Sequence, residues 1–526
     1  MPHRRLFCCF FEKRVCVNIF LKLYFVFISS KFIKLKKSYI FSNLNFKRLD
    51  FTNYKQVKSF IFKKEFYNIN NINVHCFDFL NYSQNLGGKV GISLSRDNII
   101  KWYNSNKNKI FYPWEHDYTS RRLINILYNY DFISSSSKDI KIKILKKIIL
   151  VHMFRVINEF KYKDLNEISS YDIIANSLSN LILNKNLNTQ IPYMVMIINS
   201  QVDKLGMHKA YNVLEHAKFL NNLHELKNIF LYHQIKIPSK IEELIIKMTS
   251  ILNEYFHLDG TIPLFNGANN NYTKIIYDSL NNDDYLIKRT FSSIDNGIAF
   301  YSDKSKKFFF DVVQPDKKSV SKNLNAGTLS VEFSSLGEKI ITNCGASEGH
   351  GKNPEYLRYS AAHSTIILQN TNISEIKENN PHIKFPQSVT FISNTIPGYK
   401  IYEGSHNGYQ SRFNRIIKRK VKISENDIKI DGEDSIISFK NIDDKIIYHI
   451  RFHLAAGLVF NFTNNKKNII LRSNLKNMWL FKSDTELEVE DSIIVDKNII
   501  NPTKQIVIKG FVNKNKLIRK WSLEKI

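Results

Sequence analysis

Three polar side chains that could do acid–base or hydrogen-bonding chemistry lie at the ends of short apolar segments. Asn325 comes shortly before one apolar run, and Asn343 comes directly after another. His363 comes directly before a third run, residues 364–368. Histidine exchanges a proton near neutral pH, and an asparagine amide donates hydrogen bonds to developing negative charge. If the three runs are neighbouring strands, we expect these side chains to converge, with small alanine and glycine neighbours leaving room for a ligand.

The segments around these side chains have the pattern of β-strands. Leu329, Val331 and Phe333 alternate with Ser330 and Glu332, which is typical of a strand with one face in a core. Glu332, on the polar side of this strand, either orients a neighbour or faces water. On pattern alone, the simpler interpretation of the region is a β-sandwich core with ordinary turn residues.

Three sequence blocks in this region resemble the C-terminal signature of the heparinase II/III-like family. Residues 325–332 read N-A-G-T-L-S-V-E, where the family has H-A-(D/G)-x-L-S-F-E. Residues 343–345 read N-C-G, similar to (D/N)-x-G, and residues 361–365 read A-A-H-S-T, similar to A-A-H-(S/N)-T. The order, spacing and number of blocks make the resemblance specific. It implies an α+β multidomain fold, in which an N-terminal incomplete (α/α) toroid of antiparallel helices precedes a C-terminal antiparallel β-sandwich.

The first half of the chain has the periodicity of amphipathic helices. In residues 140–160 apolar side chains fall on one side, and lysines lie opposite early in the segment. Thr119 or Ser120 is placed to cap a helix that starts at Arg121. Antiparallel helices joined by short polar loops fit a layered helical array. Helices are predicted over residues 140–160, 171–183, 211–220, 223–231 and 241–256.

Residues 257–268 end this array and resemble the family block G-D-G-x-x-x-L-F-N-G-A, and residues 269–284 read as a polar linker. From about residue 294 the period changes to that of strands. Many short apolar segments separated by turn signals predict an antiparallel sandwich. Predicted hairpin turns include Glu403-Gly404, Asn407-Gly408, Asp431-Gly432 and Asn464-Asn465. Strands are predicted over residues 298–301, 308–313, 387–392, 416–423, 428–430, 446–454, 459–462, 469–471 and 506–511.

These patterns predict three parts of the chain: an N-terminal segment (1–50), the helical toroid domain (51–285) and the sandwich domain (286–526). The first part is basic and aromatic, and its apolar stretch, residues 15–29, is short for a membrane span. A degenerate signal, an anchor, a peripheral membrane contact and a divergent cytoplasmic start all fit it. The family resemblance suggests the cell envelope or periplasm, and a cytoplasmic location stays open.

The composition limits the partners of the chain. Its 526 residues include 76 basic and 48 acidic side chains, which gives a net charge of +28. A surface that attracts polyanions is one interpretation, and a composition rich in lysine, asparagine and isoleucine is the other, which we favour for most of the charge. The lysines are scattered, without the aromatic-flanked basic motif of a nucleic-acid module, so we expect no nucleic-acid partner. The five cysteines predict neither a disulfide framework nor a structural zinc site.

The resemblance implies a function for the chain. Polysaccharide lyases of the family cleave uronic-acid-containing chains by β-elimination, which implies an anionic polysaccharide as partner and a cleft between toroid and sandwich as its site. The reaction needs neutralisation of the sugar carboxylate, a base for the C5 proton and an acid for the departing O4. The alternative is a catalytically reduced member that binds or helps to process envelope polysaccharide or exopolysaccharide without cleaving it.

The resemblance also implies roles for particular residues. His208 and Tyr211 are three residues apart, so we expect both on one helix face, where an exposed histidine and a packing tyrosine are the alternative. Asn325 and Asn343 stand where relatives have histidine and aspartate, and amides are weaker metal ligands. We therefore expect no required cofactor, and at most a weakly held zinc or calcium ion at Asn343 and His363. Catalytic candidates are His363, Tyr211, His208 and Asn325, and substrate-binding candidates are Arg358, His406, Tyr409, Arg121 and Arg122.

Overall fold

The computed structural model shows two compact units. The helical unit comprises Met1–Gln201 and Phe219–Ile245, and the sandwich unit comprises Val202–Lys218 and Ile246–Ile526. Of the N-terminal segment, only residues 41 and 44 are described. The predicted domain boundary at residue 285 also lies outside the described residues. The residues described are 41, 44, 57–59, 61–63, 71–109, 111–114, 117–135, 140–280, 297–315, 324–347, 355–377, 380–438, 445–463, 465–496 and 498–526.

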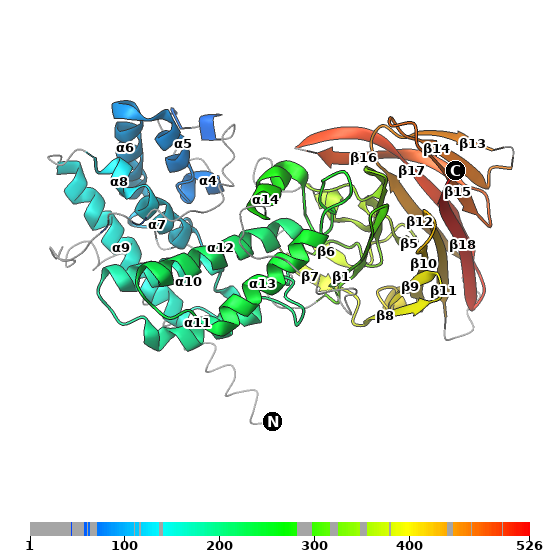
Figure 1. Cartoon of the computed structure of the whole chain (residues 1–526), viewed down its shortest axis with the longest axis horizontal. Coiled ribbons are helices and arrows are strands. Elements are labelled where there is room, and N and C mark those ends of the chain that lie inside the picture. The colour runs from blue at the N-terminus through cyan, green and yellow to red at the C-terminus, as the bar shows by residue number, and fades with distance from the viewer. Residues whose placement is uncertain are drawn as a thin grey trace, which may run out of the picture. The chain divides into compact units, whose positions relative to one another are not determined.

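The predicted helical array is confirmed in the helical unit (Figure 1, blue to green). Helix α10 packs against α7 and α9. Ser169 begins α10 with a capping box, because its side chain accepts the N–H of Asp172 while the Asp172 carboxylate accepts the N–H of Ser169. Described helices in or entering this unit are α4 (Ile72–His75), α5 (Phe79–Leu86), α6 (Gly88–Asn106), α7 (Tyr118–Tyr128), α8 (Tyr130–Ile133), α9 (Ile140–Tyr162), α10 (Ser170–Ile182), α11 (Ile191–Ser200), α12 (Val213–Tyr232) and α13 (Ser239–Glu254).

Three local helix predictions are wrong. Residues 211–220 and 223–231 belong to one helix, α12, because the buried Asn222 continues it and donates its side-chain N–H to Ser170 Oγ at 2.8 Å. Helix α7 begins at Tyr118, so Thr119 and Ser120 lie inside its first turn rather than before it. The predicted polar linker contains helix α14 (Thr273–Leu280), which turns Ile276 into the protein. Among the described residues, no helix is both long and apolar enough to cross a membrane.

The predicted antiparallel β-sandwich is also confirmed (Figure 1, green to red), and every predicted strand overlaps an observed one. Its described strands form two eight-stranded sheets, and a small β6–β7 pair (Glu375–Lys377, Asn380–Lys384) lies apart from them. The first sheet runs β1-β2-β3-β4-β12-β17-β16, with β5 paired to β12: β1 (Gly297–Ser302), β2 (Lys306–Val312), β3 (Val331–Ser335), β4 (Glu338–Thr342), β5 (Ile366–Leu368), β12 (Ile446–Leu454), β16 (Glu488–Asp496) and β17 (Ile499–Val512). The second runs β13-β14-β15-β18-β11-β10-β9-β8: β8 (Val389–Ile396), β9 (Tyr399–His406), β10 (Ile416–Ser424), β11 (Lys429–Ile437), β13 (Val459–Phe462), β14 (Asn468–Arg472), β15 (Met478–Ser483) and β18 (Lys516–Lys525).

Two predicted hairpin turns are wrong, because their glycines lie inside strands. A Cβ on Gly404, in β9, would come within 2.6 Å of the Leu329 side chain. A Cβ on Gly432, in β11, would come within 2.0 Å of the Trp521 ring. Gly404 is therefore explained by close packing across the sandwich core, and Gly432 by the Trp521 ring on the neighbouring strand β18 of the same sheet, rather than by a turn. In a sequence, a glycine can indicate either a hairpin turn or a closely packed strand position, and only the tertiary packing distinguishes the two.

Strand β3 is buried along its whole length, contrary to the prediction of one polar face. Its apolar side chains Val331 and Phe333 belong to the core between the sheets. Its polar side chains Glu332 and Ser334 are covered by the segment that follows α13, through hydrogen bonds to His257. Leu329 has a left-handed backbone (φ 64°) and lies before the strand. The alternation of side chains was predicted correctly, and the second buried face was not.

Candidate active site

His363 lies between a short 3-10 turn (Ser360–Ala362) and strand β5, and its side chain is 1% exposed. Within the described part of the chain, neither of its ring nitrogens has a hydrogen-bond partner. Burial lowers its pKa to about 4, so the ring is neutral at pH 7. A Cβ on Gly327 would come within 3.0 Å of the ring, so His363 packs directly against the Gly327 backbone. Substituting any larger residue at position 327 would displace the histidine.

Asn325 lies two residues before Gly327 and is 5% exposed. Its backbone N–H donates to Asn266 Oδ1 at 3.0 Å. Considering the described residues only, neither the oxygen nor the nitrogen of its side-chain amide has a hydrogen-bond partner. A buried polar group without a partner costs about 1–3 kcal/mol and is rare in folded proteins. Asn325 and His363 therefore place unsatisfied polar groups in one part of the sandwich unit, as a binding site for a polar ligand requires.

Tyr211 and His208 also belong to the sandwich unit, but they do not share a helix face as predicted. Helix α12 begins only at Val213, and Tyr211 has a left-handed backbone (φ 47°). His208 forms an isolated β-bridge with Val202, and burial lowers its pKa to about 4. The correction has a local cause, because Asn212 accepts the N–H of Leu214 at 2.8 Å and so begins the helix after Tyr211.

The segment at residues 257–268 connects Tyr211 to Asn325 through one side chain. Asn266 Nδ2 donates to the carbonyl oxygen of Tyr211 at 3.1 Å, and its Oδ1 accepts the N–H of Asn325. The ring of Tyr211 faces Gly297, where a Cβ would lie 2.8 Å from its Cε1. The structure thus holds the backbones of Tyr211 and Asn325 to the same asparagine.

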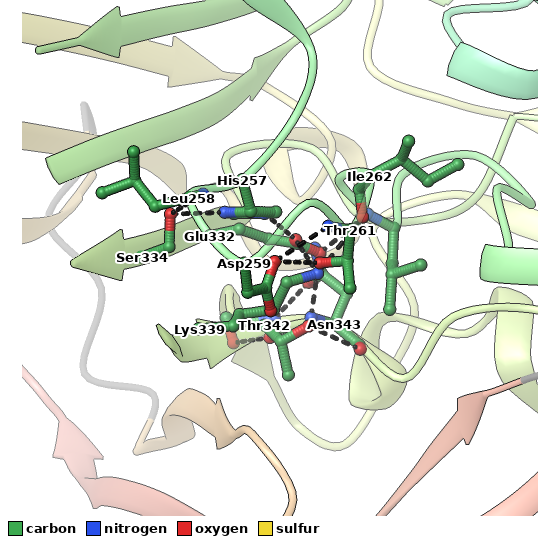
Figure 2. Close-up of polar contacts among 12 residues, drawn as sticks. His257, Leu258, Asp259, Thr261, Ile262, Glu332, Ser334, Lys339, Thr342 and Asn343 are labelled. Atoms are coloured by element: carbon green, nitrogen blue, oxygen red, sulfur yellow. Dashed lines mark hydrogen bonds and ion pairs between the residues drawn. The ribbon is translucent and has the colours of Figure 1, made fainter. Parts of the chain in front are cut away.

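A buried carboxylate, Glu332, fixes that segment to the sheet (Figure 2). Its Oε1 accepts the N–H of Leu264 at 3.0 Å and both the backbone and side-chain N–H groups of Asn343, at 3.1 and 2.9 Å. Its Oε2 contacts His257 Nε2 at 2.8 Å and Lys339 Nζ at 3.4 Å. Lys339 and these donors stabilise the anion and lower the pKa of Glu332, although its burial opposes them. Of the two predicted roles for Glu332, the structure shows the orienting one.

Asn343 is engaged on both sides of its amide. Its Nδ2 donates to Glu332, and its Oδ1 accepts the backbone N–H of Ser364 at 2.9 Å. Ser364 follows His363, so this contact helps to fix the backbone that carries the histidine. The Asn343 oxygen is thus already occupied by a protein donor. The described residues contain no cluster of three histidine, cysteine or acidic side chains that could hold a metal ion. The expectation of at most a weakly held zinc or calcium ion at Asn343 and His363 stays a prediction.

Comparison with known proteins shows what the sandwich region is similar to. The family profile described as "Heparinase II/III-like, C-terminal" matches residues 290–522. Residues 290–522 are thus similar to this family, and we call them the heparinase II/III-like domain. Asn325, Asn343 and His363 all lie within this heparinase II/III-like domain, whereas Tyr211 and Asn266 lie outside the matched residues. No curated protein matches the chain in sequence.

Solved structures resemble the chain over both units at low sequence identity. Heparinase III has a TM-score of 0.65 with 12% identity, over 96% of this chain and 89% of its own. The heparan sulfate lyase HepC from Pedobacter heparinus has a TM-score of 0.57 with 12% identity, over 87% of this chain and 77% of its own. The chondroitin AC lyase from Streptomyces coelicolor A3, in complex with chondroitin sulphate, has a TM-score of 0.52 with 6% identity, over 86% and 74%. These similarities confirm the toroid and sandwich architecture.

Within the heparinase II/III-like domain, Arg358 lies beside the Asn325 segment. It ends a 3-10 turn (Glu355–Arg358) and is half-buried, and its Nη2 donates to the carbonyl of Leu324 at 3.3 Å. The backbone carbonyl of Arg358 accepts the N–H of Ala326 at 2.9 Å. Burial lowers the pKa of its guanidinium, although Glu355 opposes the shift. Arg358 is therefore hydrogen-bonded to the backbone of the residues on either side of Asn325.

His406 and Tyr409 lie at the end of β9 in the same domain. His406 is buried, and its Nδ1 accepts the N–H of Gly408 at 3.1 Å, which leaves the proton on Nε2. Within the described chain that Nε2 has no hydrogen-bond acceptor. The Tyr409 hydroxyl donates to the carbonyl oxygen of Thr371 at 2.9 Å. His406 therefore has a free donor for a ligand, whereas the Tyr409 hydroxyl already binds the protein.

Arg121 and Arg122 belong to the helical unit. Arg122 is fully buried, with its guanidinium 4.1 Å from the ring centre of Trp102 and 4.7 Å from that of Trp114. Its Nε donates to His152 Nε2 at 3.1 Å, and burial lowers its pKa to about 9. Arg121 pairs with Asp78 at 3.3 Å. In this structure both guanidinium groups contact other residues inside the helical unit.

The sequence analysis missed Asn266 and the extent of the Glu332 network. Asn266 lies within the family-like block at residues 257–268. The resemblance of that block was recognised in the sequence, but the hydrogen bonds of Asn266 to the Tyr211 and Asn325 segments were not predicted. Glu332 was a candidate only for orienting one neighbour, yet it contacts four residues from two segments, 257–264 and 339–343. Neither role follows from spacing, because both depend on contacts between residues far apart in the chain.

Proposed function

We propose that the chain is a lyase that cleaves a uronic-acid-containing anionic polysaccharide by β-elimination. The observation that carries this proposal is the pair Asn325 and His363, whose polar side-chain atoms are buried and without partners in the described chain. A neutral imidazole can accept a proton, and a free amide can donate to a carboxylate. The heparinase II/III-like domain and the solved lyase structures support the same class of reaction.

In this proposal each step uses a side chain of this protein. The Nδ2 of Asn325, assisted by Arg358, donates to the uronate carboxylate and makes the C5 proton more acidic. His363 takes that proton, and the electrons of the C5–H bond form the double bond between C4 and C5. The C4–O4 bond breaks, and the hydroxyl of Tyr211 protonates the departing O4. The same chemistry with Tyr211 as the base is the other assignment, and the variants described in the Discussion distinguish the two.

The test is an ultraviolet absorbance assay for the unsaturated uronate, run over heparan sulfate, chondroitin sulfate, hyaluronan and alginate. The expected result is product from at least one of them with the wild-type chain, and loss of product with His363→Ala. His233→Ala, a partly exposed histidine at the end of α12, serves as a matched control and is expected to retain activity. Absence of product from every acidic polysaccharide would overturn the proposal.

The alternative, a member that binds polysaccharide without cleaving it, is favoured by a different observation. Asn325 is an amide and cannot act as a general base. The side-chain amide of Asn343 already forms hydrogen bonds with Glu332 and Ser364. This alternative predicts measurable binding of an acidic polysaccharide with no unsaturated product. Equilibrium binding of the same panel, measured beside the absorbance assay, decides between the two functions.

Three related expectations remain predictions. They are the substrate cleft between toroid and sandwich, the location in the cell envelope or periplasm, and a membrane contact of residues 1–50. Cell fractionation with an antibody against the sandwich unit tests the location directly.

A further inference from the structure

The side chain of Asn266 bonds to the segments of both Tyr211 and Asn325. It is 5% exposed and has a left-handed backbone (φ 51°). Its own carbonyl oxygen accepts a third hydrogen bond, from Asn212 Nδ2 at 3.0 Å. Asn212 and Asn266 are therefore linked reciprocally, since Asn266 in turn binds the carbonyl of the residue before Asn212.

These contacts explain why an asparagine is suited to position 266. A side-chain amide offers, on separate atoms, both a donor for the Tyr211 carbonyl and an acceptor for the Asn325 N–H. Asparagine also adopts the left-handed region more readily than other residues except glycine. Aspartate would keep the acceptor and lose the donor, whereas glycine would keep the backbone and lose both. The two substitutions thus separate the two contacts.

The backbone of Asn266 is itself fixed from the sheet. Leu264, two residues earlier, donates its N–H to the buried carboxylate of Glu332 at 3.0 Å. Tyr211 has a left-handed backbone outside any helix, so its position depends on contacts with other segments. Asn266 is thus anchored to the sheet on one side and holds the Tyr211 backbone on the other.

We propose that Asn266 is a positioning residue that keeps Tyr211 and Asn325 in a fixed relation, and that the chemical step depends on it more than substrate binding does. The catalytic part of this inference rests on the proposed lyase function. The positional part does not, because it concerns only two hydrogen bonds within the sandwich unit. A displacement of about 1 Å between catalytic groups can reduce a rate about 100-fold.

The experiment compares Asn266→Asp, Asn266→Gly and a matched control, Asn184→Gly. Asn184 has the same left-handed backbone (φ 54°) but is exposed in the helical unit. Hydrogen exchange of the peptide that contains Asn325, followed by mass spectrometry, reports its N–H bond without any activity. We expect exchange about fivefold faster or more in Asn266→Gly and near wild-type exchange in Asn266→Asp, which keeps the acceptor.

Kinetics on the polysaccharide that the wild type cleaves supply the second readout. We expect kcat to fall about 100-fold in both Asn266 variants, with KM within about threefold of wild type and no change in Asn184→Gly. A raised KM with unchanged kcat would overturn the inference, as would unchanged exchange at Asn325 in Asn266→Gly. If the wild type cleaves nothing, the proposed function fails, and the exchange data alone then support or overturn the positional part.

Discussion

Asn343 donates its side-chain N–H to the carboxylate of Glu332 across 2.9 Å, and both groups are fully buried. The amide is oriented, because its oxygen at the same time accepts the N–H of Ser364. An aspartate at this position could accept from Ser364, but it would bring a second carboxylate against Glu332. This contact explains in physical terms why an amide suits position 343 in this chain.

Asn343→Asp is therefore expected to destabilise the sandwich unit by about 3 kcal/mol, through the lost donor and the repulsion between buried carboxylates. Urea unfolding at pH 7 measures the change in the free energy of unfolding. The control is Asn465→Asp, at an exposed turn where the side-chain oxygen only accepts hydrogen bonds. That variant is expected to stay within about 0.5 kcal/mol of wild type. Equal effects of the two substitutions would contradict the role assigned to Asn343.

Gly327→Ala is expected to displace the His363 ring, because the new Cβ would lie within 3.0 Å of it. Such overpacking costs about 1–3 kcal/mol. The combination with His363→Ala removes the ring and should relieve most of that cost, so a double-mutant cycle isolates the contact. If Gly327→Ala destabilises the two backgrounds equally, its effect arises elsewhere.

His363→Ala and Tyr211→Phe are each expected to lower kcat about 100- to 10,000-fold if these groups transfer protons. The two candidate assignments differ in the pH profile. With His363 as base, its pKa of about 4 leaves it neutral and competent down to pH 4–5, so the acid limb of the wild-type profile falls there. With Tyr211 as base, activity requires loss of a phenolic proton and increases toward alkaline pH. A profile of kcat between pH 4 and pH 10 separates the assignments.

Acid is expected to destabilise the fold through its buried histidines. Burial lowers the pKa of His257 to about 4 and that of His406 to about 3, whereas an unfolded histidine titrates near 6.5. Between these values the unfolded state binds more protons, so the free energy of unfolding decreases as the pH falls below about 6.5. Each such histidine contributes up to about 1.4 kcal/mol per pH unit near pH 5.

Urea unfolding from pH 7 to pH 4.5 measures that slope. His406→Gln is expected to reduce it by up to about 1.4 kcal/mol per pH unit. A slope in the His406 variant equal to that of wild type would show that this histidine is not kept neutral by the fold.

The order of the architecture could be predicted from the sequence, because periodicity is a local property. The apolar spacing in residues 140–160 predicted α9, and the short runs after residue 294 predicted strands of the sandwich. Where local signals have two meanings, the prediction failed. Gly404 and Gly432 indicated turns, yet each lies in a strand where a packed side chain leaves no space for a Cβ, Leu329 at Gly404 and Trp521 at Gly432.

The sequence by itself determined the family resemblance and named Asn325, Asn343 and His363 as a group. Only the tertiary structure decided how these residues differ. Asn343 is bound on both sides by Glu332 and Ser364, whereas Asn325 and His363 keep polar atoms without partners in the described chain. The physical reason is that hydrogen-bond satisfaction depends on segments distant in sequence. Spacing can bring a side chain to a strand end, but the fold determines whether that side chain remains free to act.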